Sequence, residues 1–250
     1  MRDGTIVAMG ARRYLQNEVE DVFDRSTFGA VRGELILLRS HDEGHTWLGP
    51  TVVEPPLSNP LETCHAVVEL ADGRWLMPTS ILRNRDGSAP DGVRAVALVS
   101  EDRGQTWNRL LDLLDSYEQG LTRFEVSLIQ LPDQCLLAAS WAFEFKSGGS
   151  HVLRYSISKD GQSFGLARST ELNAETSKLL SLGEDRVLVV SRRFDKPGLR
   201  ATLVRIDGNT WVNMEEIPLW QGPDQNVRPA CISGRTECAA VRFSPATPAS

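Results

Sequence analysis

An eight-residue turn motif that recurs along the chain is the feature of this sequence that most constrains its fold. The pattern S-x-D-x-G-x-T-W occurs at residues 40–47 and again at 100–107, so the two full copies start 60 positions apart. Two degenerate copies follow at residues 158–164 and 207–211. A period of this size indicates that one supersecondary unit is repeated.

Each motif lies between apolar stretches that are typical of strands. Alternating stretches precede the motifs at residues 33–40, 94–100, 151–158 and 200–207, and apolar runs follow them at 51–53, 109–114, 168–172 and 212–219. Upstream of each of the last three motifs, two apolar runs flank a polar turn, at residues 71–73, 132–134 and 183–185, which predicts another hairpin. Four antiparallel strands per repeat make a propeller blade. No long segment has helical periodicity, so the sequence predicts an all-β chain.

The residue types of the motif account for a structural role. The carboxylates of Asp42 and Asp102 can accept backbone N–H bonds inside the turn, and the glycines at 44 and 104 permit a positive φ. Trp47 and Trp107 are expected to pack between neighbouring blades. We therefore assign the motif to building the fold, and none of its residues to catalysis.

Composition and charge exclude several classes of function. The 250 residues carry a formal net charge of −6, which argues against a nucleic-acid partner. No apolar run approaches the roughly 20 residues that cross a bilayer, and residues 1–10 lack the apolar core of a secretory signal. The four cysteines have no metal-ligand spacing, and we expect buried free thiols.

Together, these repeats resemble the sialidase (neuraminidase) superfamily, in chains with bacterial neuraminidase repeats, or Asp boxes. The resemblance implies a six-bladed β-propeller with its active site at the axis, on the face opposite the Asp boxes. Asp3-Gly4 matches the turn after the innermost strand of a first blade. We therefore expect an incomplete arc of about four to five blades over residues 1–234, and an irregular tail at 235–250. An upstream targeting segment would lie outside this sequence, so the compartment stays open.

Two kinds of position approach the axis of a propeller: those leading into the innermost strand of a blade, and those ending its second strand. The first group comprises Glu62 with His65, then Glu125, Glu175 and Arg228. The second comprises Arg12 and Arg13, Arg83, Trp141, and Arg192 with Arg193. One face is thus expected to gather glutamate and arginine.

The resemblance implies a chemistry for this set. The substrate of a sialidase is a carboxylated sugar, which guanidinium groups bind bidentately. Sialidases use a tyrosine nucleophile activated by a glutamate, with a separate aspartate as acid and base, because a carboxylate nucleophile would be repelled. By resemblance, Glu175 corresponds to the activating glutamate and Arg192 to a carboxylate-binding arginine. Glu125, at the equivalent point one blade earlier, competes for the role of Glu175.

Further assignments stay open. Arg12 or Arg13 matches the arginine that ends the second strand of the first blade, and Asp24 or Asp21 could be the acid and base, since the acidic loop 18–24 follows. Arg228 resembles another carboxylate-binding arginine. The chain has only Tyr14, Tyr117 and Tyr155 as nucleophile candidates, whereas the tyrosine of the family belongs to a blade absent here. We therefore expect the chain alone to be inactive as a sialidase.

The leading hypothesis is an exo-acting sialidase-type glycoside hydrolase domain, incomplete in this sequence, that removes terminal acidic sugars from glycans. Two alternatives are a propeller hydrolase for another sugar and a non-catalytic Asp-box propeller that binds glycan or protein. The expected partner is a glycan, sialylated under the leading hypothesis. The proposed chemistry needs no cofactor and no metal ion.

Overall fold

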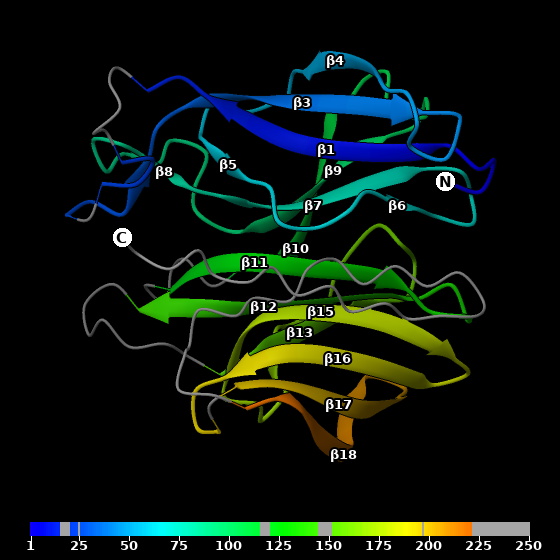
Figure 1. Cartoon of the computed structure of the whole chain (residues 1–250). Coiled ribbons are helices and arrows are strands. Elements are labelled where there is room, and N and C mark those ends of the chain that lie inside the picture. Colours follow the sequence, from blue (N-terminus) through cyan, green and yellow to red (C-terminus); the bar gives the residue numbers. More distant parts are fainter. Residues whose placement is uncertain (16–20, 25, 116–120, 145–151, 197, 222–250) are drawn as a thin grey trace. The chain divides into compact units, whose positions relative to one another are not determined.

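The computed structural model describes residues 1–15, 21–24, 26–115, 121–144, 152–196 and 198–221, and in these ranges the chain forms strands and no helix (Figure 1). Its contacts divide it into two units, Met1–Tyr117 and Glu118–Ser250, each built from its own sheets. The predicted all-β class is confirmed.

Unit 1 contains ten strands in three sheets. They are β1 (Ile6–Arg13), β2 (Gly29–Ala30), β3 (Gly33–Ser40), β4 (Leu48–Val53), β5 (Leu61–Glu62), β6 (Val68–Glu69), β7 (Trp75–Ile81), β8 (Arg83–Asn84), β9 (Ala95–Ser100) and β10 (Arg109–Leu114). One sheet has the order β1-β3-β4, and a second has the order β10-β9-β7-β5, with β6 also paired to β7. The short strands β2 and β8 form a parallel pair.

The described residues of unit 2 form eight strands in two four-stranded sheets. They are β11 (Leu121–Gln130), β12 (Leu136–Glu144), β13 (Arg154–Ser158), β14 (Arg168–Ser169), β15 (Ala174–Gly183), β16 (Arg186–Arg193), β17 (Gly198–Asp207) and β18 (Thr210–Trp220). Both sheets are antiparallel meanders, β11-β12-β13-β14 and β15-β16-β17-β18, in which every strand pairs with the next one along the chain. This is the strand order predicted for a propeller blade.

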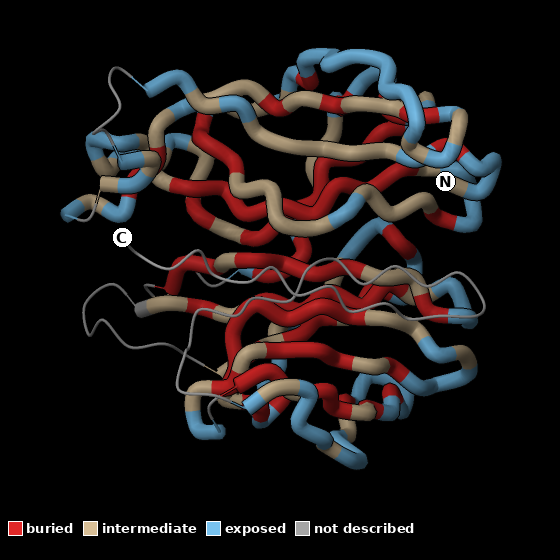
Figure 2. The backbone as a smooth tube through the Cα atoms, viewed as in Figure 1, coloured by how far each residue is buried: buried red, intermediate tan, exposed pale blue. Residues whose placement is uncertain are grey.

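The core of each unit lies between two of its sheets, as the buried segments in Figure 2 indicate. In unit 1, Leu35 and Leu37 of β3 pack in one cluster with Trp75, Met77 and other buried residues of the second sheet. In unit 2, a cluster joins residues of the β11–β14 sheet to residues of the β15–β18 sheet. Neighbouring sheets thus stabilise each other by burying apolar surface between them.

The Asp-box turns have the hydrogen bonds that their residue types predict. The Asp42 carboxylate accepts bonds from the Thr46 backbone N–H at 2.8 Å and the Thr46 hydroxyl at 2.6 Å. Asp102 bonds to Thr106 in the same way, at 2.9 and 2.6 Å. Gly44 and Gly104 have φ of 93° and 79°. The carboxylate of the motif therefore closes the corner between two strands.

The tryptophans that end these motifs differ in burial. Trp107 is 2% exposed in the core between the two larger sheets of unit 1. Trp211, in the degenerate copy of unit 2, is 8% exposed and packs on the Tyr155 ring of the preceding sheet, with ring centroids 5.2 Å apart. Trp47 is 41% exposed. The predicted packing between sheets thus holds for Trp107, whereas Trp47 lies at the surface of unit 1.

The strand boundaries agree closely with the sequence pattern. The stretches predicted at 33–40 and 109–114 coincide with β3 and β10, and the turns at 132–134 and 183–185 join β11 to β12 and β15 to β16. The predicted tail at 235–250 lies outside the described residues. The number of blades in the arc stays a prediction.

We expect Gly104→Ala to destabilise the fold more than Gly73→Ala. Both glycines have φ near 80–90°, so both alanines meet the same backbone strain. A Cβ on Gly104 would lie 3.0 Å from ring carbons of Trp75, whereas a Cβ on Gly73 would have no atom within 4 Å. Overpacking adds about 1–3 kcal/mol. Urea unfolding of both variants measures the difference, and equal losses would show that the Trp75 contact is unimportant.

The Asp-box carboxylates should make stability fall in acid. Their hydrogen bonds lower the pKa of Asp42 and of Asp102 to about 2, from an ordinary value near 4. Because the folded-state pKa is depressed, this stabilisation is complete above pH ~4 and is lost as pH falls toward 2. Asp102→Asn should therefore lose stability at pH 7 and show a flatter decline of melting temperature between pH 4 and 2. A parallel decline in variant and parent would contradict this.

Candidate functional site

The first strands of the two sheets of unit 2, β11 and β15, lie side by side, and a β-bulge interrupts both at the same point. A backbone bond from Leu179 N–H of β15 to the Ser127 hydroxyl of β11, at 3.2 Å, joins them. The register of β11 on β12 shifts between Phe124 and Ser127, and that of β15 on β16 shifts between Glu175 and Lys178. Bulges re-aim side chains and are frequent beside functional sites.

The bulge of β11 directs Glu125 toward β15. Glu125 has φ of 52°, an uncommon conformation for a residue with a side chain, and it is 9% exposed. Its Oε2 accepts the Trp141 indole N–H at 2.7 Å and a short bond from the Thr176 hydroxyl. Trp141 is itself held by stacking on Phe124 at 5.1 Å. The Glu125 carboxylate is thus buried, oriented and attached to both neighbouring strands.

Glu175 and Arg192 form an ion pair across β15 and β16. They are directly opposed in the register, and their side chains are only 9% and 17% exposed. Glu175 and Arg192, which the resemblance assigns to one site, are therefore in contact in the structure. Thr176, which bonds to the Glu125 carboxylate, directly follows Glu175 in the chain.

The register corrects the expected equivalence of Glu125 and Glu175. Phe124 is opposed to Trp141 at the start of one bulge, and Glu175 is opposed to Arg192 at the start of the other. Glu125 therefore corresponds to Thr176, which also has a positive φ, of 50°. Glu125 and Glu175 consequently occupy different places in their strands, one in the bulge and one before it.

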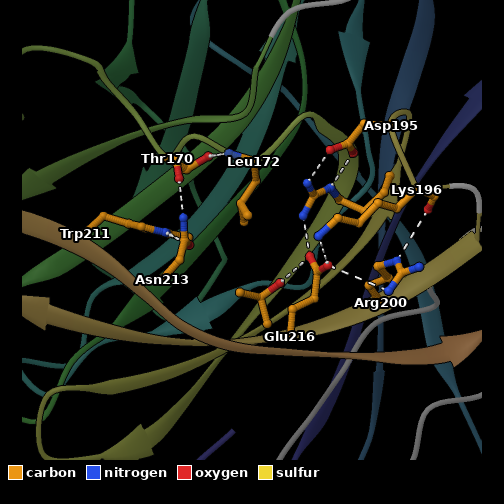
Figure 3. A network of polar contacts seen from close by, with 10 residues as sticks. Thr170, Leu172, Asp195, Lys196, Arg200, Trp211, Asn213 and Glu216 are labelled. Atoms are coloured by element: carbon orange, nitrogen blue, oxygen red, sulfur yellow. Dashed lines mark hydrogen bonds and ion pairs between the residues drawn. The ribbon is translucent and has the colours of Figure 1, made fainter.

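Arg193 belongs to a different network from Arg192, because successive strand residues point to opposite faces. Arg193 is 6% exposed, binds both carboxylate oxygens of Asp195 at 2.9 and 2.8 Å and makes a short ion pair with Glu216. Lys196 and Arg200 surround the same Glu216 at 2.9 and 3.7 Å (Figure 3). Burial alone would raise the pKa of Glu216, but the Lys196 bond and the neighbouring guanidinium groups lower it. This arrangement stabilises the end of the β15–β18 sheet.

In unit 1, Arg12 and Arg13 also separate to two faces. Arg13 donates to the Leu61 carbonyl at 2.6 Å and makes a short bond to the Val31 carbonyl, so it ties β1 to the neighbouring sheet. Burial lowers the pKa of Arg13, and the Glu62 charge opposes this shift. Arg13 lines a pocket of about 400 Å³ at the end of β1, β3 and β4.

Arg12 is exposed and forms a cluster with Glu34 and Tyr14. Its Nε donates to Glu34 Oε2 at 3.0 Å, and its guanidinium lies 5.5 Å from the centre of the Tyr14 ring. The Tyr14 hydroxyl donates to the same Glu34 oxygen at 2.8 Å. This bond to Glu34 raises the pKa of Tyr14, which keeps the phenol protonated.

The loop with Asp21 and Asp24 is fixed against the end of β8. Gly29 pairs with Arg83, and its backbone lies so close to the Asn84 carbonyl that a Cβ would approach it to 1.9 Å. Asp24 accepts bonds from the Ser26 N–H at 2.8 Å and the Ser26 hydroxyl at 2.5 Å, and these lower its pKa to about 2. The Asp24 carboxylate is therefore ionised and closes its own turn. An ionised carboxylate can accept a proton or a hydrogen bond but has no proton to donate. Asp21 is exposed, and its carbonyl accepts a bond from Arg85.

The remaining candidates are placed as follows. Glu62 ends β5, and His65 lies between β5 and β6 with Nδ1 3.0 Å from the Ala66 carbonyl. Tyr155 is buried and its hydroxyl donates to the Asn209 carbonyl at 3.0 Å, which gives it a structural role. Arg228 and Tyr117 lie outside the described residues. Cys64 and Cys135 are free but half-buried, which is less burial than expected.

Sequence reasoning missed Thr176 and the Tyr14–Glu34 pair. A signal for Thr176 exists in the sequence, because aligning Leu128 with Leu179 and Leu131 with Leu182 places Glu125 opposite Thr176. The bond between Tyr14 and Glu34 depends on the register of β1 on β3, in which Arg12 opposes Glu34. Nothing in the residue types alone signals that register.

The residues that the structure describes contain no group of three or more His, Cys, Asp or Glu side chains that could hold a metal ion. They also contain no helix with the length and apolarity to cross a bilayer.

Unit 2 thus consists of antiparallel four-stranded meanders, in each of which a repeat turn joins the third strand to the fourth. The chain belongs to the BNR repeat-like domain family, whose model matches residues 23–234. No match was found among curated proteins.

Solved structures share the fold at low sequence identity. A protein of unknown function from Dyadobacter fermentans is similar with a TM-score of 0.68 and 23% identity, over 92% of this chain and 65% of that one. A Hadza microbial sialidase is similar with a TM-score of 0.61 and 17% identity, over 85% and 44%. The NanB sialidase from Streptococcus pneumoniae is similar with a TM-score of 0.59 and 15% identity, over 92% and 36%. The chain thus spans less than two thirds of the length of these proteins.

We expect Arg193→Ala to lower the free energy of unfolding by about 2 kcal/mol, because it removes the closest cation from Glu216, which keeps Lys196 and Arg200 as partners. Arg12→Ala is the matched control, because the Arg12–Glu34 pair is exposed, at 45% and 36%. It should unfold at the same urea concentration as the parent protein. Equal effects of the two substitutions would contradict a structural role for Arg193.

Proposed function

We propose that this chain is a sialidase-type glycoside hydrolase domain that acts on terminal acidic sugars of glycans. The observation that carries the proposal is the buried group on the bulges of β11 and β15, in which Glu175 pairs with Arg192 and Glu125 bonds to Thr176. Family membership and the sialidases among the structures of similar fold support a carbohydrate substrate.

In this proposal, the arginines recognise the substrate carboxylate. Arg192 presents a guanidinium that is held in place by Glu175 and is partly accessible, at 17%. A guanidinium binds a carboxylate bidentately, and the low polarity around a buried pair strengthens that interaction. Arg228 is a further candidate for this role, and Arg13 is left out because it already donates to the Val31 and Leu61 carbonyls. Arg193 is left out, because its donors are committed to Asp195 and Glu216.

The carboxylates are proposed to act in the chemical step. Glu175 is proposed to orient the group that attacks the sugar, and Glu125, fixed by two hydrogen bonds, to stabilise positive charge that develops on the ring. Asp24 and Asp21 stay candidates for proton transfer. Tyr14 is 59% exposed with its hydroxyl bonded to Glu34, whereas Tyr155 is buried with its hydroxyl in a structural bond.

A second candidate function is non-catalytic glycan binding. It is favoured by the low pKa of Asp24, at about 2, which opposes a role as proton donor near neutral pH. The same arginines and carboxylates would then recognise a glycan without cleaving it.

The test is release of the fluorophore from a 4-methylumbelliferyl α-sialoside by the protein in its natural full-length context. Glu175→Gln should lower kcat roughly a hundredfold. Arg192→Lys should raise KM about tenfold, because lysine cannot replace a bidentate contact. The control variants are Glu184→Gln and Arg186→Lys, an exposed pair at the other end of the same hairpin, and both should match the parent.

Absence of turnover, with sialylated glycan still bound and with binding lost in Arg192→Lys, would overturn the hydrolase and support the binding module. Turnover unaffected by either substitution would place the site elsewhere.

A further inference from the structure

A second pocket in unit 1, of about 360 Å³, lies apart from the groups assigned above. It is lined by Tyr14, Ala30, Val31, Arg32, Asn84, Arg85 and Asp86. Its volume falls in the range of pockets that hold small organic ligands. The parallel pairing of β2 with β8 brings the two chain segments of its wall together.

One wall of this pocket is an aromatic ring held rigidly at the surface. The Tyr14 side chain is 59% exposed, yet its hydroxyl is bonded to Glu34 and one side of its ring is contacted by the Arg12 guanidinium. An exposed tyrosine normally loses rotamer freedom when it binds a ligand. Here the two contacts restrict that freedom in advance, so the ring is a prepared stacking surface.

Arg32 provides a polar wall that is shared with the first pocket. It lines both the 400 Å³ and the 360 Å³ pockets and is exposed. Within the ranges that the structure describes, no hydrogen bond or ion pair is found for its guanidinium. It therefore differs from Arg12 and Arg13, whose donors are engaged.

The rim of the pocket combines donors and acceptors of both charge signs. Asp86 is ionised, since its bonds to Ser88 lower its pKa, and it faces the same pocket as Arg32 and Arg85. The base is apolar, with Ala30 and Val31. A fully anionic ligand would meet the Asp86 charge, whereas a ring of hydroxyl groups can donate to the carboxylate and accept from the guanidinium groups.

We propose that this pocket is a subsite for a neutral hexopyranose unit, whose C–H face stacks on Tyr14 and whose hydroxyls bond to Arg32 and Asp86. A pyranose has an apolar face and a polar rim, which matches the aromatic wall, the apolar base and the mixed polar edge. The inference rests on the proposed function only in taking a glycan as ligand, and it assigns residues outside the Glu175 group.

The neutral probes are methyl β-D-glucopyranoside and methyl β-D-galactopyranoside. The anionic probes, for comparison, are methyl β-D-glucuronide and inorganic phosphate. Binding is followed by ligand-observed saturation-transfer NMR and by amide shifts of the protein. At least one neutral pyranoside should bind, and Tyr14→Ala should raise its Kd about five- to tenfold, the loss of one aromatic contact. Tyr14→Phe keeps the ring and should bind within about twofold of the parent.

Arg32→Ala should also weaken the neutral pyranoside. Arg103→Ala is its matched control, because Arg103 is another exposed arginine and lies on an Asp-box turn of the same unit. All variants change exposed side chains, and an unchanged melting temperature establishes that they fold. A Tyr14→Ala variant that binds like the parent would overturn the proposal. So would binding of only glucuronide or phosphate in an Arg32-dependent manner, which would make the pocket an anion site.

The outcome is separable from that of the proposed function. Loss of sialoside turnover in Glu175→Gln with unchanged pyranoside binding would leave the subsite in place. Tyr14-dependent binding in a chain that never releases sialic acid would support the subsite and contradict the hydrolase.

Discussion

The hydrogen bonds of one carboxylate at each sheet corner determine how the rest of this fold is built. Asp42 and Asp102 each bind the backbone and hydroxyl of the threonine four residues later, which closes the turn and sets the direction of the next strand. At the second turn this geometry delivers Trp107 into the core between two sheets. Since isolated sheets of three or four strands bury one face at most, sheet-to-sheet packing supplies most of the apolar burial. The hydrogen bonds of the Asp box contribute little stability by themselves, but they position Trp107, which buries a large apolar surface.

Local irregularities of two strands, the β-bulges of β11 and β15, position the residues of the candidate site. A regular β11 or β15 would alternate its side chains strictly between the two faces, and Glu125 could not then reach Thr176. The bulges change this, at the cost of a positive φ for Glu125 and Thr176. Residues in such conformations persist where the surroundings hold them, and here Trp141 and the hydroxyl of Thr176 hold the Glu125 carboxylate. The positive φ of Glu125 and the burial of its carboxylate are therefore two consequences of the same bulge.

The sequence was sufficient to predict the strands, because the apolar alternation and the Asp-box turns are local signals. Boundaries such as Gly33–Ser40 and the three hairpin turns follow from residues within a few positions of each other. The association of Glu175 with Arg192 was inferred from the family resemblance, because two register shifts between the turn and this pair make a count from the hairpin turn misleading. The equivalence of Glu125 was misplaced by one residue, although aligning the apolar residues of the two strands places Glu125 opposite Thr176. Tyr14–Glu34 could not be predicted, since it depends on pairing across the long connection between β1 and β3.

Arginine is abundant around the candidate groups, and the structure separates its members by what their donors already bind. Arg193 is saturated by two carboxylates, Arg13 bonds two carbonyls, and Arg12 supports a tyrosine ring. Arg192 pairs with Glu175, and its side chain keeps 17% of its surface accessible. Because a guanidinium has five donors in a rigid fork, an arginine between two carboxylates cannot receive a further anion without losing a bond. Arginines that look alike in the sequence therefore differ in what their donors already bind, and residue type alone does not reveal that difference.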